Sequence, residues 1–292
     1  MSSHQAATID PFGFPLTAGV LRGVVRAALE EDRAFDDVTT LATIPATAMS
    51  SAVLAARKPG VVCGVPLAVE AFQLLSPHVR VETLRMDGSA VEPGDDILRV
   101  SGPSRALLQA ERVALNYMMH LSGVATLTRT FVHAIAGTAA HILDTRKTTP
   151  GLRVLEKYAV RCGGGRNHRM DLASMAMLKD NHLAAVGGDI AAAVAAVRLA
   201  APTGLRVEVE ADRRAQVERA LAAGADVIML DNMPLDEMQA CVRLVAGTAI
   251  LEASGGVTLD RVRAIAETGV DWISVGALTH SAPALDLGLD FA

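Results

Sequence analysis

The chain has 292 residues, of which 51% are hydrophobic and 20% are charged, and its formal net charge is -5. These values allow a substantial core in one large domain or two ordinary ones. They exclude a basic face for general nucleic-acid binding, so any anion site must be local to one part of the chain.

Nothing in the sequence directs the chain to a membrane. The first residues, MSSHQAATIDPFGFP, lack a basic start followed by an apolar run, and no stretch is apolar for the roughly 18 residues that a membrane span needs. The three cysteines, at positions 63, 162 and 241, have neither disulfide nor tetrahedral zinc spacing. We therefore expect a soluble, cytoplasmic protein that binds neither membrane nor nucleic acid.

The first half of the chain predicts helices around an antiparallel sheet. Apolar residues fall at helical spacing from Leu16 to Asp32, and the polar stretch EEDRAFDDVTT that follows predicts a loop leading into a strand. Between Ser51 and Val100, short apolar runs and a Pro-Gly turn indicate strands, interrupted by one helix at PLAVEAFQLL. Helical periodicity then continues over residues 104–135, where we expect two helices separated near Ser122 and Gly123.

The second half of the chain predicts a parallel α/β barrel. Six short apolar runs, each ending in charged or Gly-rich residues, alternate with Ala-rich helical segments of the length that parallel crossovers need. In such barrels the residues at the carboxyl ends of the strands line the active site. The runs are HILDTRK, AMLKDNH, RVEVEAD, DVIMLDN, AILEASGG and WISVGAL.

The predicted site has a cationic half and an acidic half. Arginine and lysine fit a ligand with several negative groups, whereas carboxylates fit sugar hydroxyls, a divalent cation or a developing positive charge. A phosphorylated sugar that reacts with a polyanionic partner satisfies both halves. The cationic half consists of Arg146, Lys147, His168, Arg169 and Lys179, and the acidic half of Glu210 and Asp231.

Two Gly-rich strand endings indicate a phosphate site. ASGGVT, at residues 253–258, and VGALTH, at residues 275–280, fall where barrels commonly bind phosphate through backbone N–H groups and a helix N-terminus. A glycine that only permits a tight turn is an equal alternative for either stretch alone, but two neighbouring stretches favour phosphate. The candidate residues are Ser254, Gly255, Gly256 and Gly276.

Several charged residues also have a plainer interpretation. Glu208 and Glu210 fall on the same face of their strand, so the pattern does not tell which of the two serves the site. Asp231 fits a helix N-cap as well as a ligand contact. We interpret three charges on the helical stretch GLRVLEKYAVR as solvated surface charges; they are Arg153, Lys157 and Arg161.

Eight motifs, in this order and spacing, resemble quinolinate phosphoribosyltransferases, a family also called carboxylating nicotinate-nucleotide pyrophosphorylases. They are DTRKTTPGLR, KYAVRCGGG, NHRM, KDNHL, VEVE, MLDN, EASGG and LTHSAPALD, and DDVTT and ERVALNYMMHLSGVAT extend the resemblance over nearly the whole chain. The resemblance implies an N-terminal α/β sandwich domain over residues 1–113. It further implies an incomplete parallel α/β barrel, of the type II phosphoribosyltransferase class, over residues 114–283, and residues 284–292 are a candidate to pack on the first domain.

The resemblance also implies a reaction. Phosphoribose would pass from 5-phosphoribosyl 1-pyrophosphate to the ring nitrogen of quinolinate, with magnesium, and carbon dioxide would then leave. The products would be nicotinate mononucleotide, pyrophosphate and carbon dioxide, in NAD biosynthesis.

The motifs carry residue roles with them. Quinolinate would be bound by Arg146, Lys147, His168 and Arg169, and Lys179 would contact its carboxylate or a phosphate. Glu210 and Asp231 would face the ribose hydroxyls and the magnesium, and together with Lys147 they are the catalytic candidates. Phosphate would be bound by Ser254, Gly255, Gly256, Gly276 and His280.

One implied role crosses between subunits. Arg112 of ERVALN would reach into the neighbouring subunit's site, so a homodimer, or a multiple of it, is the expected assembly. The chain departs from the family pattern at three positions. The family usually has glycine where this chain has Asp36, and often a glycine and an aspartate where it has Asp171 and Ser174; the last two departures leave the geometry beside Arg169 open.

Two other functions stay open beside the enzyme. One is a related barrel protein, of the kind found in some molybdate-transport operons, with a different substrate; the intact NHR and KDNH motifs favour the enzyme over it. The other is a non-catalytic anion-binding scaffold. Against the scaffold, every charged strand ending is intact.

Overall fold

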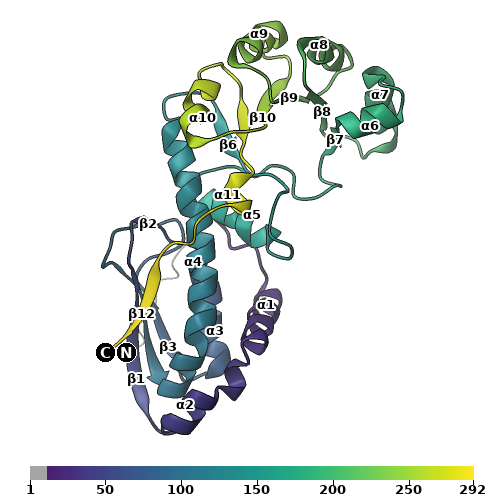
Figure 1. Cartoon of the computed structure of the whole chain (residues 1–292). Coiled ribbons are helices and arrows are strands. Elements are labelled where there is room, and N and C mark those ends of the chain that lie inside the picture. Colours follow the sequence, from purple (N-terminus) through teal and green to yellow (C-terminus); the bar gives the residue numbers. More distant parts are fainter. Residues whose placement is uncertain (1–11) are drawn as a thin grey trace, which may run out of the picture. The chain divides into compact units, whose positions relative to one another are not determined.

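The computed structural model describes residues 12–292, which form two compact units (Figure 1). The first unit holds the chain up to Leu127 together with Val154–Gly163 and Ala282–Ala292. The second unit holds Thr128–Arg153 and Gly164–Ser281. The boundary expected between residues 113 and 114 lies inside the continuous helix α4 (Ser104–Ala134), and the first unit extends along that helix to Leu127.

The first unit is built on an antiparallel sheet of four strands in the order β12-β1-β5-β3. The last of these in the chain, β12, is the C-terminal segment, and it forms an edge strand beside β1. The strands are β1 (Met49–Ala56), β3 (Arg80–Thr83), β5 (Asp96–Pro103) and β12 (Leu287–Phe291), and a separate pair is formed by β2 (Gly60–Val61) and β4 (Ala90–Val91). The helices are α1 (Ala18–Glu31), α2 (Val38–Thr43), α3 (Val65–Leu75), the first part of α4 (Ser104–Ala134) and most of α5 (Arg153–Cys162).

The predicted break near Ser122 and Gly123 is wrong, because α4 runs without interruption over 31 residues. The Ser122 hydroxyl accepts a hydrogen bond from Cys63 N at 2.8 Å and donates one to the Cys63 carbonyl at 3.1 Å. A Cβ at position 123 would collide with the Pro283 carbonyl. The two small residues therefore permit a close approach of other chain segments, and they do not end the helix.

The predicted loop into a strand is also wrong at DDVTT. Asp37 is the N-cap of α2, and its side chain accepts hydrogen bonds from Thr39 N at 3.0 Å and Thr40 N at 3.1 Å. Hydrogen bonds from Thr40 hold the pKa of Asp37 below its ordinary value. A capping aspartate starts a helix at a stretch that is otherwise β-branched and polar.

Helix α5 contradicts the interpretation of its charges as solvated. Lys157 is completely buried, as is its neighbour Glu156, and the Glu156 carboxylate lies 2.9 Å from His120 Nε2. Arg161 is half-buried with its guanidinium 5.6 Å from the centre of the Tyr158 ring. Arg153 is half-buried too, and it donates to the Thr148 hydroxyl and the Met170 carbonyl.

The second unit contains the predicted parallel sheet, and all six runs are confirmed as strands. The sheet has the order β6-β11-β10-β9-β8-β7, with parallel pairing throughout. It does not close between β6 and β7, although Arg166 adds one parallel bridge to Leu143 at the outer edge of β6. The strands are β6 (His141–Leu143), β7 (Ala176–Leu178), β8 (Val207–Ala211), β9 (Val227–Asp231), β10 (Ile250–Ser254) and β11 (Trp272–Ser274).

Helices follow the strands and form an arc outside the curved sheet (Figure 1). The strand interiors are almost completely buried, as expected when helices cover a parallel sheet. No helix in the described part of the chain is long and apolar enough to cross a membrane. The helices are α6 (Asp180–Ala185), α7 (Ile190–Ala200), α8 (Arg214–Ala222), α9 (Leu235–Val245), α10 (Leu259–Ala266) and α11 (Ala277–His280).

Candidate active site

Parallel pairing brings the charged strand endings of the second unit to one edge of the sheet. The Lys179 ammonium, just past β7, lies 3.2 Å from the Glu210 carboxylate on β8. Asp231 ends β9 directly opposite Ser254, which ends β10. The strand-end ring, as we call this set, consists of Lys147, Lys179, Glu210, Asp231, Ser254, Gly255, Gly256 and Gly276.

The ring is completed where β6 and β11 end. The Thr279 hydroxyl donates to the Lys147 carbonyl at 2.7 Å. A Cβ on Gly276 would lie 3.1 Å from both Lys147 Cδ and His280 Nε2. Lys147, Gly276 and His280 are therefore neighbours, although about 130 residues of chain separate the first two.

The Gly-rich ending of β10 has a structural reason for its glycines. Gly255 has a φ of +89°, and a Cβ there would collide with the Asn232 carboxamide. Gly256 also has a left-handed φ, of +56°. These conformations form the turn between β10 and α10, and the interpretation of the turn as a phosphate site remains a prediction.

Asp231 does not cap a helix. The N-cap of α9 is Pro234, three residues further on, and the Asp231 carboxylate accepts from the Asn232 side chain at 2.9 Å. Because Asp231 is the last residue of β9 and is only partly buried, its carboxylate belongs to the strand-end ring.

Glu208 and Glu210 share a face of β8, but the structure separates them by depth. Glu208 is completely buried inside the barrel, whereas the Glu210 side chain is 16% exposed and pairs with Lys179. Glu210 is thus the strand-end carboxylate that the sequence pattern left undecided.

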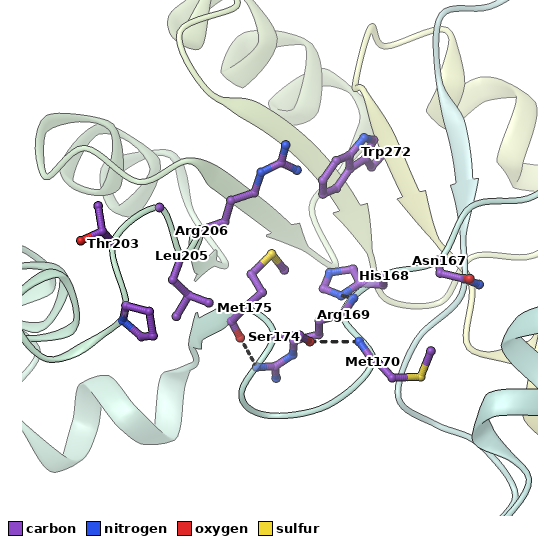
Figure 2. A pocket seen from close by; sticks show the side chains of 12 residues that line it. Asn167, His168, Arg169, Met170, Ser174, Met175, Thr203, Leu205, Arg206 and Trp272 are labelled. Atoms are coloured by element: carbon purple, nitrogen blue, oxygen red, sulfur yellow. Dashed lines mark hydrogen bonds between the residues drawn. The ribbon is translucent and has the colours of Figure 1, made fainter. Parts of the chain in front are cut away.

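A buried aspartate fixes the segment that carries His168 and Arg169. The Asp144 carboxylate accepts from the His168 backbone N–H at 2.9 Å and from the Asn167 side chain. Arg169 donates to the Met175 carbonyl at 3.0 Å (Figure 2). Sequence reasoning gave Asp144 no role, although an acid directly after a buried apolar run is the signal that could have revealed it.

Arg146 and Arg169 lie close enough to interact electrostatically. Burial lowers the pKa of Arg169, and the charge of Arg146 lowers it further. The buried Nε of Arg146 has no hydrogen-bond partner among residues 12–292. A guanidinium nitrogen that is buried without a partner is costly, so this geometry suits an anionic ligand.

His168 lies in a buried group with two carboxylates, which we call the His168 cluster. Its Nε2 is 3.2 Å from Glu208 Oε2 and 3.1 Å from Glu252 Oε2, and the three side chains are at most 5% exposed. Its Nδ1 accepts from the Arg169 N–H at 2.7 Å. Both ring nitrogens therefore face protein groups, and the contact between His168 and substrate that the motif implied stays a prediction.

The proton of the His168 cluster has two candidate positions. Burial lowers the pKa of His168, but hydrogen bonds and charge from Glu208 and Glu252 outweigh burial and raise it to about 9. Burial also raises the pKa of Glu208, to about 7. If both ring nitrogens carried a proton, the Nδ1–H and the Arg169 N–H would point at each other and repel. We therefore assign a neutral ring with its proton on Nε2, and we assign the additional proton of the cluster to the carboxylates.

Asp171 and Ser174 form the turn that follows Arg169. One Asp171 oxygen accepts from Ala173 N at 2.9 Å and Ser174 N at 2.8 Å, and the Ser174 hydroxyl accepts from Met170 N at 3.2 Å (Figure 2). No ion pair involves Asp171 in the part of the chain that the structure describes. The two departures from the family pattern thus build the turn with side-chain hydrogen bonds.

A cavity of about 550 Å³ borders the same segment (Figure 2). Met175 and Arg206 directly precede β7 and β8, and Trp272 is the first residue of β11, so this cavity opens toward the amino ends of the strands. We assign the site to the strand-end ring, where the opposite charges gather. The cavity is lined by Asn167, His168, Arg169, Met170, Ser174, Met175, Pro202, Thr203, Gly204, Leu205, Arg206 and Trp272.

Comparison with known proteins gives matches over nearly the whole chain. Residues 37–122 match the model of the quinolinate phosphoribosyl transferase N-terminal domain, and residues 124–290 match that of its C-terminal domain. The nicotinate-nucleotide pyrophosphorylase [carboxylating] of Mycobacterium leprae is 46% identical over 279 residues, covering 92% of this chain and 96% of the relative.

Solved structures are similar over the same extent. The nicotinate-nucleotide pyrophosphorylase of Francisella tularensis is 36% identical with a TM-score of 0.89, covering 96% of this chain and 98% of that one. The NadC protein of Streptococcus pyogenes is 40% identical with a TM-score of 0.90, covering 95% and 99%.

The Glu208→Gln variant should flatten the pH dependence of stability. An unfolded glutamate titrates near 4.3, whereas Glu208 titrates near 7 in the folded chain, so the folded state binds more protons between these values. Its contribution therefore falls as pH rises through this window, by on the order of 1–3 kcal/mol, and glutamine mimics the protonated form. Urea unfolding at about pH 5 and about pH 8 measures the difference, with Glu210→Gln as the control in the same strand. Equal losses in the wild type and Glu208→Gln would contradict the assignment.

Proposed function

The chain belongs to the quinolinate phosphoribosyltransferase family, and we infer from this membership that it transfers phosphoribose from 5-phosphoribosyl 1-pyrophosphate to quinolinate. Decarboxylation accompanies the transfer and gives nicotinate mononucleotide, pyrophosphate and carbon dioxide in NAD biosynthesis. The observation that carries this conclusion is the match of both domains to the family. The names of the relatives favour it over the transport-operon barrel and the scaffold protein.

We propose that the two carboxylates of quinolinate bind between the cationic side chains. Arg146 and Arg169 are close enough to interact, and the arginine fork matches the geometry of a carboxylate. Lys147 and Lys179 would add more mobile point charges. The unpartnered Nε of Arg146 supports this role, because a carboxylate oxygen would satisfy it.

The phosphoribosyl donor is proposed to bind along the other side of the strand-end ring. Glu210 and Asp231 end neighbouring strands, and their carboxylates suit the ribose hydroxyls. The backbone N–H groups of Ser254, Gly255, Gly256 and Gly276, with the His280 side chain, are the proposed phosphate contacts. The left-handed glycine turn before α10 supports this assignment.

The residues of the ring suit the chemistry of both steps. Breaking the bond between the sugar and pyrophosphate develops positive charge on the ribose, which the carboxylates of Glu210 and Asp231 would stabilise. The quinolinate nitrogen then forms the new bond to the sugar carbon, and holding it in line is the task of the cations around its carboxylates. Carbon dioxide leaves from the carbon beside the now positive nitrogen, which stabilises the remaining electron pair until that carbon takes a proton. No general base is needed before decarboxylation, so Lys147 is a binding group first.

We propose that magnesium accompanies the phosphoribosyl donor. Glu210 and Asp231 are hard oxygen donors, partly exposed and on neighbouring strands, and magnesium is commonly bound by one or two carboxylates plus substrate phosphates. The donor set therefore fits this ion. When bound, magnesium would neutralise the charge of the leaving pyrophosphate.

A homodimer, or a multiple of it, is the proposed assembly. Arg112 is exposed on α4, as the proposed contact with a neighbouring subunit's site requires. We also propose that the protein acts in the cytoplasm; Cys63, Cys162 and Cys241 are buried and form no disulfide within residues 12–292, which suits a reducing compartment.

Arg146→Ala and Arg169→Ala are each expected to lower kcat/KM for quinolinate by roughly 10- to 1,000-fold, because each removes a charge-assisted contact to the dicarboxylate. Carbon dioxide release from labelled quinolinate, with donor and magnesium, measures the loss. Arg99→Ala is the control, since Arg99 is an exposed residue of β5 whose ion pairs, among the residues that the structure describes, are with Asp96 and Glu82. Unchanged turnover in both variants would refute the site, and turnover of nicotinate in place of quinolinate would refute the substrate.

Removal of magnesium with a chelator is expected to abolish carbon dioxide release, and added magnesium should restore it. Glu210→Gln and Asp231→Asn should each raise the magnesium concentration needed for half-maximal activity by several-fold, because each weakens a hard oxygen ligand. Calorimetric titration of the donor, with and without magnesium, gives a second readout. Full activity in excess chelator would count against the proposed ion.

The variants Arg112→Ala and Arg146→Ala should be nearly inactive alone and should complement each other when refolded together. A mixed dimer has one site with both arginines intact, so random pairing predicts about a quarter of wild-type activity. Activity of the mixture is compared with that of each variant refolded alone. A mixture that regains nothing would mean that Arg112 serves its own subunit or no site.

A further inference from the structure

The His168 cluster is a costly arrangement that the proposed contacts do not use. Glu208 on β8 and Glu252 on β10 are separated by strand β9, yet their carboxylates contact the same nitrogen of His168. Both side chains are completely buried. None of their four oxygens has a well-aligned hydrogen bond within residues 12–292. Two carboxylates held this way repel each other and lose their hydration, so apolar residues of similar size would be expected to make a more stable core.

A metal ion is the first explanation to consider for such a group. The ligand atoms of His168, Glu208 and Glu252 all lie within 4.8 Å of one another. However, Nδ1 of His168 accepts a hydrogen bond from the Arg169 N–H, so the ring proton resides on Nε2. A protonated nitrogen has no free lone pair, so Nε2 cannot ligate a metal while this hydrogen bond is present.

With its proton on Nε2, the ring acts as a link between the carboxylates and the segment that carries Arg169. The two carboxylates attract the Nε2–H side of the ring, which turns Nδ1 toward the backbone of Arg169. Asp144 fixes the same segment from its other side, through the His168 backbone N–H and the Asn167 side chain. The backbone just before the Arg169 side chain is thus fixed by three buried acids.

We propose that Glu208 and Glu252 are positioning residues for quinolinate binding, which act by holding His168 so that its Nδ1 fixes the backbone of Arg169. The inference rests on the proposed function, since it assigns Arg169 to the quinolinate carboxylates. His168 itself is the residue through which the two carboxylates position Arg169.

The cluster also supplies charge where Arg146 and Arg169 need it. The negative charges of Glu208 and Glu252 raise the pKa of Arg169, against the effects of burial and of Arg146. Two arginines that gather to bind a dianion repel each other before it arrives. Buried carboxylates behind Arg169 offset this repulsion without competing for the ligand face.

The test compares Glu252→Leu with Glu252→Gln by steady-state kinetics and thermal unfolding. Leucine removes one of the two carboxylates beside His168 Nε2, so KM for quinolinate should rise by roughly tenfold or more, while KM for the phosphoribosyl donor changes by less than about twofold. Glutamine keeps an acceptor oxygen, so it should restore KM for quinolinate to within about threefold of wild type. Glu267→Gln, at an exposed pair with Arg263, is the control.

Two results would overturn the proposal. One is a folded Glu252→Leu enzyme with unchanged KM for quinolinate. The other is an equal rise of KM for quinolinate and for the phosphoribosyl donor in both variants, which would indicate a purely structural role. If Glu252→Leu does not fold, Glu208→Leu is compared with Glu208→Gln by the same ratio of KM values, with the same two results overturning the proposal.

A nitrogen NMR measurement on histidine-labelled wild type tests the cluster without reference to catalysis. The His168 signals at about neutral pH should show a protonated Nε2 and an unprotonated Nδ1. A ring protonated on both nitrogens, or only on Nδ1, would overturn the positioning route. If wild type showed this tautomer but no turnover of quinolinate, the proposed function would fail while the cluster geometry stood.

Discussion

Parallel hydrogen bonding between six neighbouring strands fixes where the charged strand ends of this protein must lie. The strands are short and their interiors are mostly apolar and buried, so most of the polar groups gather where the strands end. Chain distance then becomes irrelevant: Lys147 and Gly276 are neighbours because β6 pairs with β11. The ion pair between Lys179 and Glu210 follows in the same way from the pairing of β7 with β8.

Depth along a strand divides the acids of the barrel into two kinds. Glu210 and Asp231 lie at the ends of their strands, partly exposed, where a carboxylate can contact a ligand. Glu208 and Glu252 lie inside the barrel, where both carboxylates contact the same nitrogen of His168. Burial raises the pKa of Glu208 to about 7. The outer acids suit chemistry on a sugar, whereas the inner acids suit control of the neighbouring cations. One strand, β8, supplies an acid of each kind two residues apart.

The sequence predicted the fold better than it predicted the environment of single residues. Six apolar runs were recognisable because a strand buried on both faces leaves a continuous pattern, and the motifs identified the family. Side-chain alternation could not separate Glu208 from Glu210, since period two gives the face and not the depth. The continuity of α4 and the burial of Lys157 were missed because both depend on contacts with distant segments, which local periodicity does not record. Glu252 was missed as well, although a lone acid inside a fully apolar strand demands a buried partner.

The turn after Arg169 shows how a departure from a family pattern can leave a site intact. A glycine is useful in a turn because it adopts conformations that other residues avoid, but hydrogen bonds from a side chain can stabilise an ordinary turn instead. Asp171 accepts from two backbone N–H groups, and the Ser174 hydroxyl accepts from Met170 N, so the turn is closed from both ends. The charge of Asp171 is directed into the turn, and hydrogen bonds from Ala173 and Ser174 hold its pKa below the ordinary value. Arg169 therefore depends for its position on Asp144 and the His168 cluster on one side and on a self-contained turn on the other, and neither needs the family's glycine.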